Sequence, residues 1–292
     1  MKAGKDTGKA LSYCAELVYG QDRERFLSAM TAPADRREFL FALYAFNHEI
    51  AKTSGVVSEP MLGQIRLQWW REAIDECYGG SPRRHAVVTA LARAIAETTP
   101  SRSIFERVID AREGDLEFAS PKTMADLEGY AAATSGGLTE LALEISSGLG
   151  EGLPDMARQA ARDIGTAWGM IGLMRALPFH MRARRGMMPT DVAYSHNVSS
   201  VDLAEARNVP GLSLAVEEVC GRASGLLNRA RVNRQLNVSI ADVFGALSIG
   251  VLADSHLRQL KKVRYDVFDP RLSAPPALRG LSLMLRSLRN RY

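Results

Sequence analysis

Two separated groups of side chains have the residue types to do chemistry in this chain of 292 residues. The first lies in LYAFNHEIAKTSG, residues 43–55, where Glu49 is the single acid beside His48 and Lys52. The second lies in RALPFHMRARRGMMP, residues 175–189, and joins one histidine to four arginines: Arg175, His180, Arg182, Arg184 and Arg185. Cations stabilise a helix C-terminus by roughly 0.3–1 kcal/mol, but arginine also forks onto carboxylates and phosphates. The second group therefore indicates either a helix end or a mouth that binds an anion or a partner.

Aromatic side chains form a third candidate group. Trp69 and Trp70 are adjacent in LQWWREAIDECYGG, residues 67–80, and Tyr44 and Phe46 lie in the first charged segment. Large aromatic side chains dominate protein cores, so packing in the core is one interpretation. The alternative is that Tyr44, Phe46 and Trp70 line an apolar cavity beside the charged groups.

The motifs that the chain lacks exclude several kinds of site. It has no P-loop, no GxGxxG motif, no HExxH pair and no GxSxG elbow. Its five histidines do not pair at ligand spacing, and its three cysteines show no CxxC motif. We therefore expect no metal site, no cofactor and no disulfide. The net charge of +4 is too small to indicate a nucleic-acid-binding protein.

The elements that must position these groups are predicted to be helices, because the apolar residues repeat with helical period and no segment alternates like a strand. We expect helices over residues 8–19, 35–53, 60–79, 82–98, 101–118, 121–149 (loosened at Gly136–Gly137), 155–182, 211–235, 239–264 and 274–290, with a turn-rich connection over 187–200. With no repeat or long linker, they predict one all-α domain, a single-domain helical bundle over residues 1–292. Neither a signal peptide nor a run of ~20 apolar residues is present, so we expect a cytoplasmic protein, at most peripheral to a membrane.

Six segments between about Arg23 and Leu272 form an ordered set of motifs. They are LYAFNHEIA (43–51), WREAIDECYGG (70–80), GDLEF (114–118), LEGYAAATSGGL (127–138), DIGTAWGMIGLMRALPFHMRARRGMMP (163–189) and KVRYDVFDPRL (262–272). In this order they resemble the squalene/phytoene synthase family. The resemblance implies a helical bundle of the trans-prenyl synthase type. In active members it also implies two aspartate-rich motifs that hold Mg²⁺ across the bundle around a prenyl diphosphate.

The carboxylates of both motifs are missing from this chain. The corresponding positions hold Ala51, Lys52 and Gly55 in the first motif, near Glu49, and Ala176, Phe179 and His180 in the second. Mg²⁺ takes oxygen ligands, and a cationic or apolar group at a ligand position opposes binding. We therefore expect no catalytic residue and no Mg²⁺ at these degenerate positions. We also expect Lys52 and His180 to lie near each other across the mouth of the bundle.

These departures resemble a non-catalytic subgroup of the family, similar to the mitochondrial complex I assembly factor of this fold. The resemblance rests on AFNHEIA (45–51) and LMRALPFH (173–180). It implies help in assembling a membrane respiratory complex, complex I, with assembly intermediates or the membrane surface as partners. Two alternatives stay open: a prenyltransferase that condenses two prenyl diphosphates with altered metal ligands, and an isoprenoid- or lipid-binding protein.

Two further expectations concern the ends of the chain. The lack of an import sequence suggests a bacterial relative of the mitochondrial factor. The expected C-terminal helix is basic and amphipathic, a composition typical of peripheral membrane contact; its arginines are Arg279, Arg286, Arg289 and Arg291.

Overall fold

The computed structural model describes residues 11–117, 120–232, 238–273, 280 and 283 of the chain. Within these residues every regular element is helical, which confirms the all-α prediction. The longer helices are α1 (Tyr13–Gln21), α2 (Arg23–Met30), α3 (Arg37–Ala51), α5 (Pro60–Tyr78), α6 (Ala86–Thr98), α7 (Arg102–Asp110), α8 (Met124–Ala131), α9 (Gly137–Ser147), α10 (Asp155–Arg175), α14 (Pro210–Val232), α15 (Ile240–Leu247) and α16 (Ile249–Lys262). The shorter ones are α4 (Thr53–Val56), α11 (Leu177–Arg182), α12 (Thr190–Ser195), α13 (Ser200–Ala204), the 3₁₀ turns η1 (Gly114–Leu116), η3 (Gly150–Gly152) and η4 (Pro270–Leu272), and the π-helical turn η2 (Ala132–Gly136).

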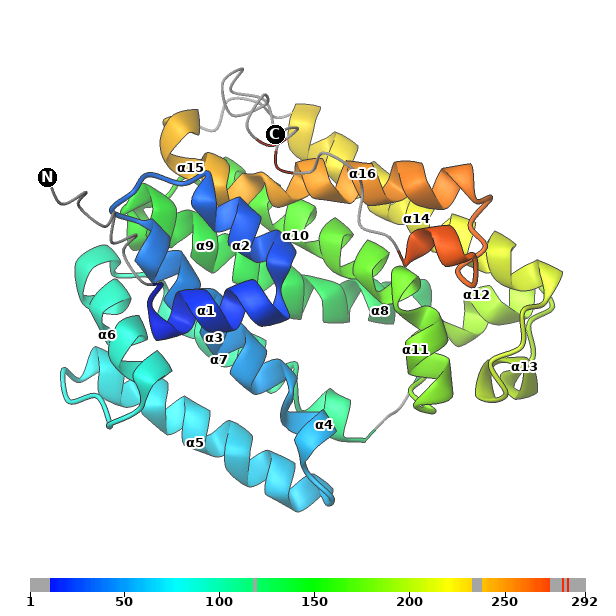
Figure 1. Ribbon diagram of the computed structural model, residues 1–292, viewed down its shortest axis with the longest axis horizontal. Helices are drawn as coiled ribbons and strands as arrows, with labels where there is room; N and C mark the ends of the chain where they lie inside the picture. The colour runs from blue at the N-terminus through cyan, green and yellow to red at the C-terminus, as the bar shows by residue number, and fades with distance from the viewer. Residues whose placement is uncertain (1–10, 118–119, 233–237, 274–279, 281–282, 284–292) are drawn as a thin grey trace, which may run out of the picture.

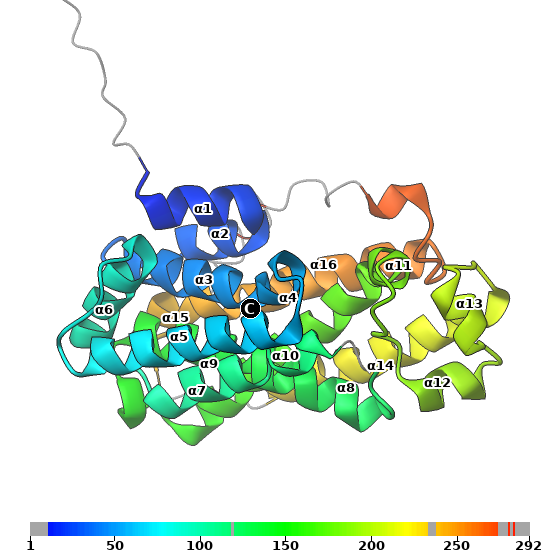
Figure 2. The ribbon, with the colours of Figure 1, turned by 90° about the horizontal axis from the view of Figure 1, so that it is seen from below.

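Helix α10 is the central element of the bundle, as predicted for the segment that begins at Asp155. It packs against α8, α9 and the π-turn η2 on one side and against α14 and α16 on the other. Figure 1 shows α5 and α6 at one end of the molecule and α11, α12 and α13 at the other. Figure 2 shows α1 and α2 covering α3 on one face, with α7 and α8 on the opposite face.

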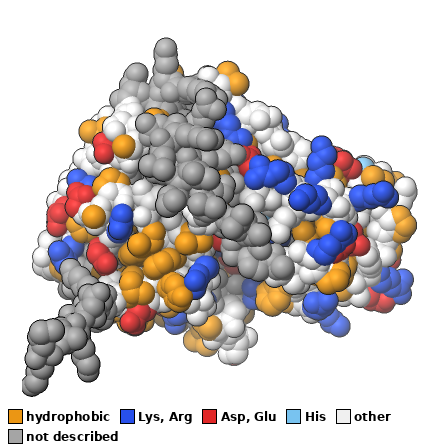
Figure 3. All heavy atoms as spheres, turned by 45° about the horizontal axis from the view of Figure 1, so that its top comes forward, with side chains coloured by type: hydrophobic (Ala, Val, Ile, Leu, Met, Phe, Trp, Pro, Cys, Tyr) orange, Lys and Arg blue, Asp and Glu red, His pale blue; other side chains and the backbone are white. Residues whose placement is uncertain are grey.

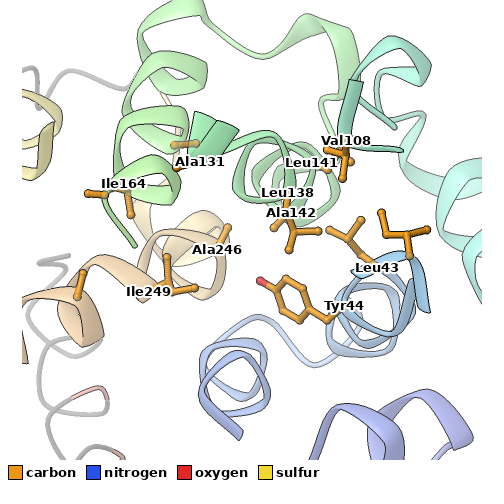
Figure 4. Packing of buried hydrophobic residues seen from close by; sticks show 14 of the residues in the cluster. Leu43, Tyr44, Val108, Ala131, Leu138, Leu141, Ala142, Ile164, Ala246 and Ile249 are labelled. Carbon is orange, nitrogen blue, oxygen red and sulfur yellow. The ribbon is translucent and has the colours of Figure 1, made fainter. Parts of the chain in front are cut away.

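The core forms where α3 crosses beneath α9. Every residue of α3 from Phe39 to Phe46 is buried, so this helix is apolar all round, as expected for an internal helix. Figure 4 shows Leu43 and Tyr44 of α3 meeting Leu138 and Ala142 of α9. Side chains of α7, α8, α10, α15 and α16 join the same large apolar cluster. A second, small cluster comprises Val251, Leu252 and Leu283.

The segment expected to be a loosened helix contains the π-turn η2. It lies against α10, where glycines let the two backbones come close. A methyl group added at Gly165 would lie 2.8 Å from the Cβ of Thr139, and one added at Gly136 would lie 2.9 Å from the Oγ1 of Thr166. π-turns insert one extra residue into a helix. The predicted loosening at Gly136–Gly137 is therefore a local widening beside a close helix contact.

Some predicted boundaries were wrong, and proline explains the most important one. The helix expected over residues 155–182 ends at Arg175, and α11 starts separately at Leu177. Pro178 has no N–H and its ring clashes with the carbonyl four residues earlier, so α10 cannot continue through it. The helix expected over 239–264 likewise breaks at Ser248, and the connection expected over 187–200 contains α12. Helix α2 was not predicted; Asp22 caps it by accepting a 3.0 Å hydrogen bond from the backbone N of Arg25.

The cysteines Cys14, Cys77 and Cys220 are buried and free. Among the described residues no single helix has the length and apolarity needed to span a membrane; α15 and α16 reach both only as a pair bent by 41°. The expected C-terminal basic helix lies outside the described residues, apart from Gly280 and Leu283.

Candidate functional site

The first degenerate motif occupies the last turn of α3 and the short helix α4. Here Glu49 is almost fully buried, with a side chain 8% exposed. Its carboxylate accepts hydrogen bonds from Nζ of Lys52 at 2.6 Å and from Nη2 of Arg66 at 3.1 Å. Two cations therefore share the one acid, and its oxygens are occupied within the chain. Arg66, on α5, was not singled out from the sequence.

The second degenerate motif lies where α10 breaks into α11. Ala176 is the C-cap residue of α10, and Phe179 is 66% exposed. His180 carries a buried Nδ1 that has no hydrogen-bond partner within the described part of the chain. Burial, and then the charge of Arg185, lower the pKa of His180 below its usual value. His180 is thus favoured in its neutral form.

Arg175 turns away from these positions and into the bundle. Its Nη1 lies 3.1 Å from Nε2 of His256 on α16 and 3.9 Å from a carboxylate oxygen of Glu24 on α2. His256 is fully buried and lies 2.7 Å from the same glutamate. Arg175 therefore joins three helices, and the structure does not group it with the arginines at the end of α11 and directly after it. Glu24 and His256 lie far apart in the sequence, and neither belongs to a motif from which their contact could have been predicted.

Arg185 connects the two motifs. Its Nη2 donates a 3.1 Å hydrogen bond to the backbone carbonyl of Ser54 in α4, and lies 4.0 Å from where a Cβ on Gly55 would be. Its backbone N donates to the carbonyl of His180 at 2.8 Å. The next residue, Gly186, packs so tightly on Ser120 that any side chain would clash. We call the region formed by residues 49–55 and 176–185 the mouth. The structure places Arg185 across it, and the proximity of Lys52 to His180 stays a prediction.

Arg182 and Arg184 differ from Arg185 because both are exposed. Within the residues that the structure describes, neither side chain forms an ion pair or a hydrogen bond. Arg184 also has a φ of 54°, in the left-handed region that non-glycine residues seldom occupy. A left-handed residue after the C-cap is a common way for a helix to end, and here it ends α11. The mouth therefore presents two guanidinium groups to solvent, one of them on a left-handed backbone.

The aromatic candidates lie behind the mouth. Burial raises the pKa of Tyr44 to about 12, and its ring packs toward α9 (Figure 4). Phe46 is fully buried and makes edge-to-face contacts with Trp70 and Phe105, at ring-centroid distances of 5.5 and 5.4 Å. Trp70 is 2% exposed, yet it also lines a cavity of about 420 Å³ together with Glu49. Both interpretations of the tryptophan pair therefore apply to Trp70.

The mouth does not fit the Mg²⁺ cluster that active family members use. Side-chain oxygen donors are absent from the six degenerate positions, and Glu49 is already bound to two cations. Across the described ranges, no three His, Cys, Asp or Glu side chains gather in a group that could hold a metal ion. A hard dication needs several oxygen ligands. The residues of this site therefore do not supply the ligands that Mg²⁺-assisted ionisation of a diphosphate requires.

Comparison with known proteins identifies the fold and the family of this chain. A solved dehydrosqualene synthase superposes with a TM-score of 0.80 at 17% identity, covering 95% of this chain and 94% of that one. The class is thus an all-α bundle of the squalene-synthase type. Residues 18–277 match squalene/phytoene synthase, and the chain belongs to this family. Relatives include "NADH dehydrogenase (ubiquinone) complex I, assembly factor 6" from Bos taurus, 33% identical over 96% of this chain and 82% of that protein, and from Mus musculus, 32% identical with the same coverage.

Proposed function

We propose that this chain is a non-catalytic member of the squalene/phytoene synthase family that assists assembly of a membrane respiratory complex, complex I. The names of its 32–33% identical relatives support the process. The chemistry of the mouth supports the absence of catalysis, and one observation carries most weight: the sole acid of the first motif, Glu49, is buried and bound by both Lys52 and Arg66. A site that keeps its carboxylate in this way has little capacity to recruit a dication.

In this proposal the mouth is a binding surface. Arg182 and Arg184 are exposed and unpaired within the described residues, so they suit the carboxylates of an acidic segment on an assembly intermediate. A second basic surface lies where α16 ends. Figure 3 shows Lys and Arg side chains gathered over one half of the visible face. The exposed cations in the last turns of α16 and directly after it are Arg258, Lys261, Lys262 and Arg264. Such a surface suits the anionic face of a membrane, consistent with a cytoplasmic protein that works at the membrane.

The proposal is tested by complementation of cells that lack this gene. Wild type should restore assembled complex I on native gels and NADH:quinone activity in membranes. Arg182→Glu with Arg184→Glu should restore both poorly while the purified variant unfolds at the wild-type urea concentration, because neither side chain has a partner to lose. Arg84→Glu with Arg93→Glu is the matched control, since it reverses two exposed charges near α6. If deletion of the gene leaves complex I intact, the assembly role is wrong.

The two alternatives have their own measurements. Turnover of farnesyl or geranylgeranyl diphosphate by the purified chain with Mg²⁺ would replace this proposal with a prenyltransferase that has altered ligands. An isoprenoid or lipid that co-purifies in stoichiometric amount, identified by mass spectrometry, would favour the lipid-binding alternative.

A further inference from the structure

A cavity behind the mouth has features that the assembly role does not use. It lies between α3, α5 and the start of α6, and its volume is about 420 Å³. Its lining residues are Glu49, Val57, Leu62, Ile65, Arg66, Trp69, Trp70 and His85. Glu49 and Ala51 are two positions apart on α3, which separates them by about 200° around the helix. The cavity is therefore on the other side of α3 from the degenerate position at Ala51. Its size is within the range of roughly 300–1,000 Å³ found for small-molecule sites.

Three aromatic rings form the inner wall of this cavity. The ring centroids of Trp69, Trp70 and His85 lie 5.0 to 5.5 Å from one another, and each pair meets edge to face. Trp70 is held from behind by Phe46, 5.5 Å away between centroids. Rings fixed in this way lose little conformational freedom when they bind a ligand, so the wall is preorganised for an apolar molecule.

The opening of the cavity is also apolar. Leu62 and Ile65, which line it, are 47% and 60% exposed, and the neighbouring Val56 and Met61 are 59% and 67% exposed. Figure 1 shows that this corner, where α4 meets α5, projects from the bundle. Single exposed apolar side chains are ordinary, but a cluster around a cavity marks a site of binding.

The polar end of the cavity has more positive than negative charge. Glu49 is its acid, and the carboxylate is shared between Lys52 and Arg66. Two nitrogens of lining residues, Nε of Arg66 and Nδ1 of His85, are buried and have no hydrogen-bond partner within the described residues. A buried polar atom without a hydrogen-bond partner is unfavourable and calls for an explanation. An acceptor oxygen supplied by a ligand would satisfy both the positive charge and the Nε–H of Arg66, whereas Nδ1 of His85 donates or accepts according to its tautomer.

We propose that this cavity binds a small apolar molecule that ends in a carboxylate, with its apolar body against Trp69 and Trp70 and its acid group toward Arg66. The shared chemistry fits a flat aromatic acid and a fatty acid. This binding site goes beyond the proposed assembly function. It does not depend on that function, because the cavity is lined by neither Arg182 nor Arg184.

Calorimetric titration of the purified full-length chain tests the site with four probes: 2-naphthoate, dodecanoate and the corresponding neutral alcohols. Both acids compete for one site if the proposal is correct, and the tighter one tells whether the native ligand is flat or a chain. We expect Arg66→Gln to weaken the acids by about tenfold, or about 1.4 kcal/mol, and to leave the alcohols nearly unchanged. Ile65→Glu, at the exposed opening, should weaken the acids as well.

Two controls separate this site from the rest of the molecule. Arg71→Gln removes a charge from the same helix, where Arg71 pairs with Asp110 and Glu113 rather than with the cavity; binding should not change. Arg182→Glu with Arg184→Glu should also leave binding unchanged, whatever it does to complex assembly. The proposal is overturned if neither acid binds at ~1 mM, or if acids and alcohols bind equally, or if Arg66→Gln has no effect on the acids.

Discussion

Two charged regions of this molecule contain the same types of side chain but differ in how those side chains are paired. One, the flank, comprises Ser101, Arg107, Glu140, Glu144, Arg158 and Arg162, which lie where α7, α9 and α10 meet. The other is the mouth. In the flank both acids are buried, at 3% and 0% exposure, and each of the three arginines contacts an acid. In the mouth the motif carboxylates are replaced, and Arg182 and Arg184 contact no acid within the described residues.

The comparison teaches how to separate structural from functional charge. A buried acid whose hydrogen bonds are all made within the chain is expensive to disturb and holds helices together. Exposed cations without partners contribute little to folding, so they are available to bind other molecules. The sequence alone does not show whether a charged cluster is structural or available for binding, because the partners of its side chains come from distant segments.

The largest expected effect comes from breaking the flank. The Glu144 carboxylate accepts hydrogen bonds from the backbone N and the Oγ of Ser101 at 2.7 and 2.8 Å, and also pairs with Arg158. Glu144→Ala leaves the half-buried guanidinium and a buried N–H without that acceptor, so it should lower the free energy of unfolding by about 3–5 kcal/mol. Urea denaturation measures it. Glu151→Ala, an exposed acid nearby, should stay within about 0.5 kcal/mol; a similar small loss for Glu144→Ala would show that the flank is not structural.

A smaller loss is expected from separating α10 and the π-turn, since α10 carries arginines of the flank at one end and leads to the mouth at the other. A Cβ at Gly165 would clash with the backbone of Ser135 and with Thr139. Gly165→Ala should therefore destabilise by about 1–3 kcal/mol through overpacking. Gly172→Ala is the control in the same helix, because a Cβ there meets nothing within 4 Å; it should stabilise by about 0.5–1 kcal/mol. Equal effects of the two changes would contradict the close contact.

Much of this architecture could be predicted from local patterns. Helical period and capping residues gave the all-α class, the central position of α10 and the loosening near Gly136, because these depend on residues close in the sequence. The loss of both metal-binding motifs was also visible, since it needs only residue identities. The break at Pro178 could have been foreseen from its missing N–H, and the length of the apolar pattern concealed it.

The contacts that define the mouth could not be predicted in this way. Arg185 reaches Ser54 across 131 positions, and Arg66 reaches Glu49 from another helix. The four arginines looked equivalent in the sequence, yet Arg175 joins α2 and α16, Arg185 closes the mouth, and Arg182 and Arg184 are exposed. Only tertiary packing assigns these roles.

Within the mouth, Arg185 should behave like a residue of the flank. Arg185→Gln removes the donor to the Ser54 carbonyl, and a hydrogen bond that involves a charged group contributes about 1.5 kcal/mol or more. We expect a loss of about 1.5 kcal/mol in urea denaturation, with the α4 amides exchanging hydrogen faster by mass spectrometry. Unchanged exchange in α4 would show that Arg185 does not hold the mouth closed.

Arg184 should show the opposite behaviour. Its φ of 54° costs an L-residue roughly 1–2 kcal/mol, which glycine avoids at the expense of greater chain entropy in the unfolded state. Arg184→Gly should therefore stabilise the chain by about 0.5–1 kcal/mol while it weakens complex I assembly in the complementation experiment. Destabilisation, or full complementation by a more stable variant, would remove the case for a strained binding residue.

The smallest expected effect is a pH dependence of stability that comes from the histidines near the mouth. Burial and Arg185 lower the pKa of His180 below its ordinary 6.5, and burial and Lys52 lower that of His48. In the unfolded chain both protonate near 6.5, whereas the folded chain resists, so the unfolded state binds more protons in that window. Stability should therefore be complete above about pH 7, fall as the pH drops through about 6.5, and level off below the folded-state pKa values. Urea denaturation between pH ~8 and ~5 measures the slope. His180→Gln should remove part of it and the double change with His48→Gln most of it; a slope that survives in the double variant would assign the pH dependence to groups other than these two histidines.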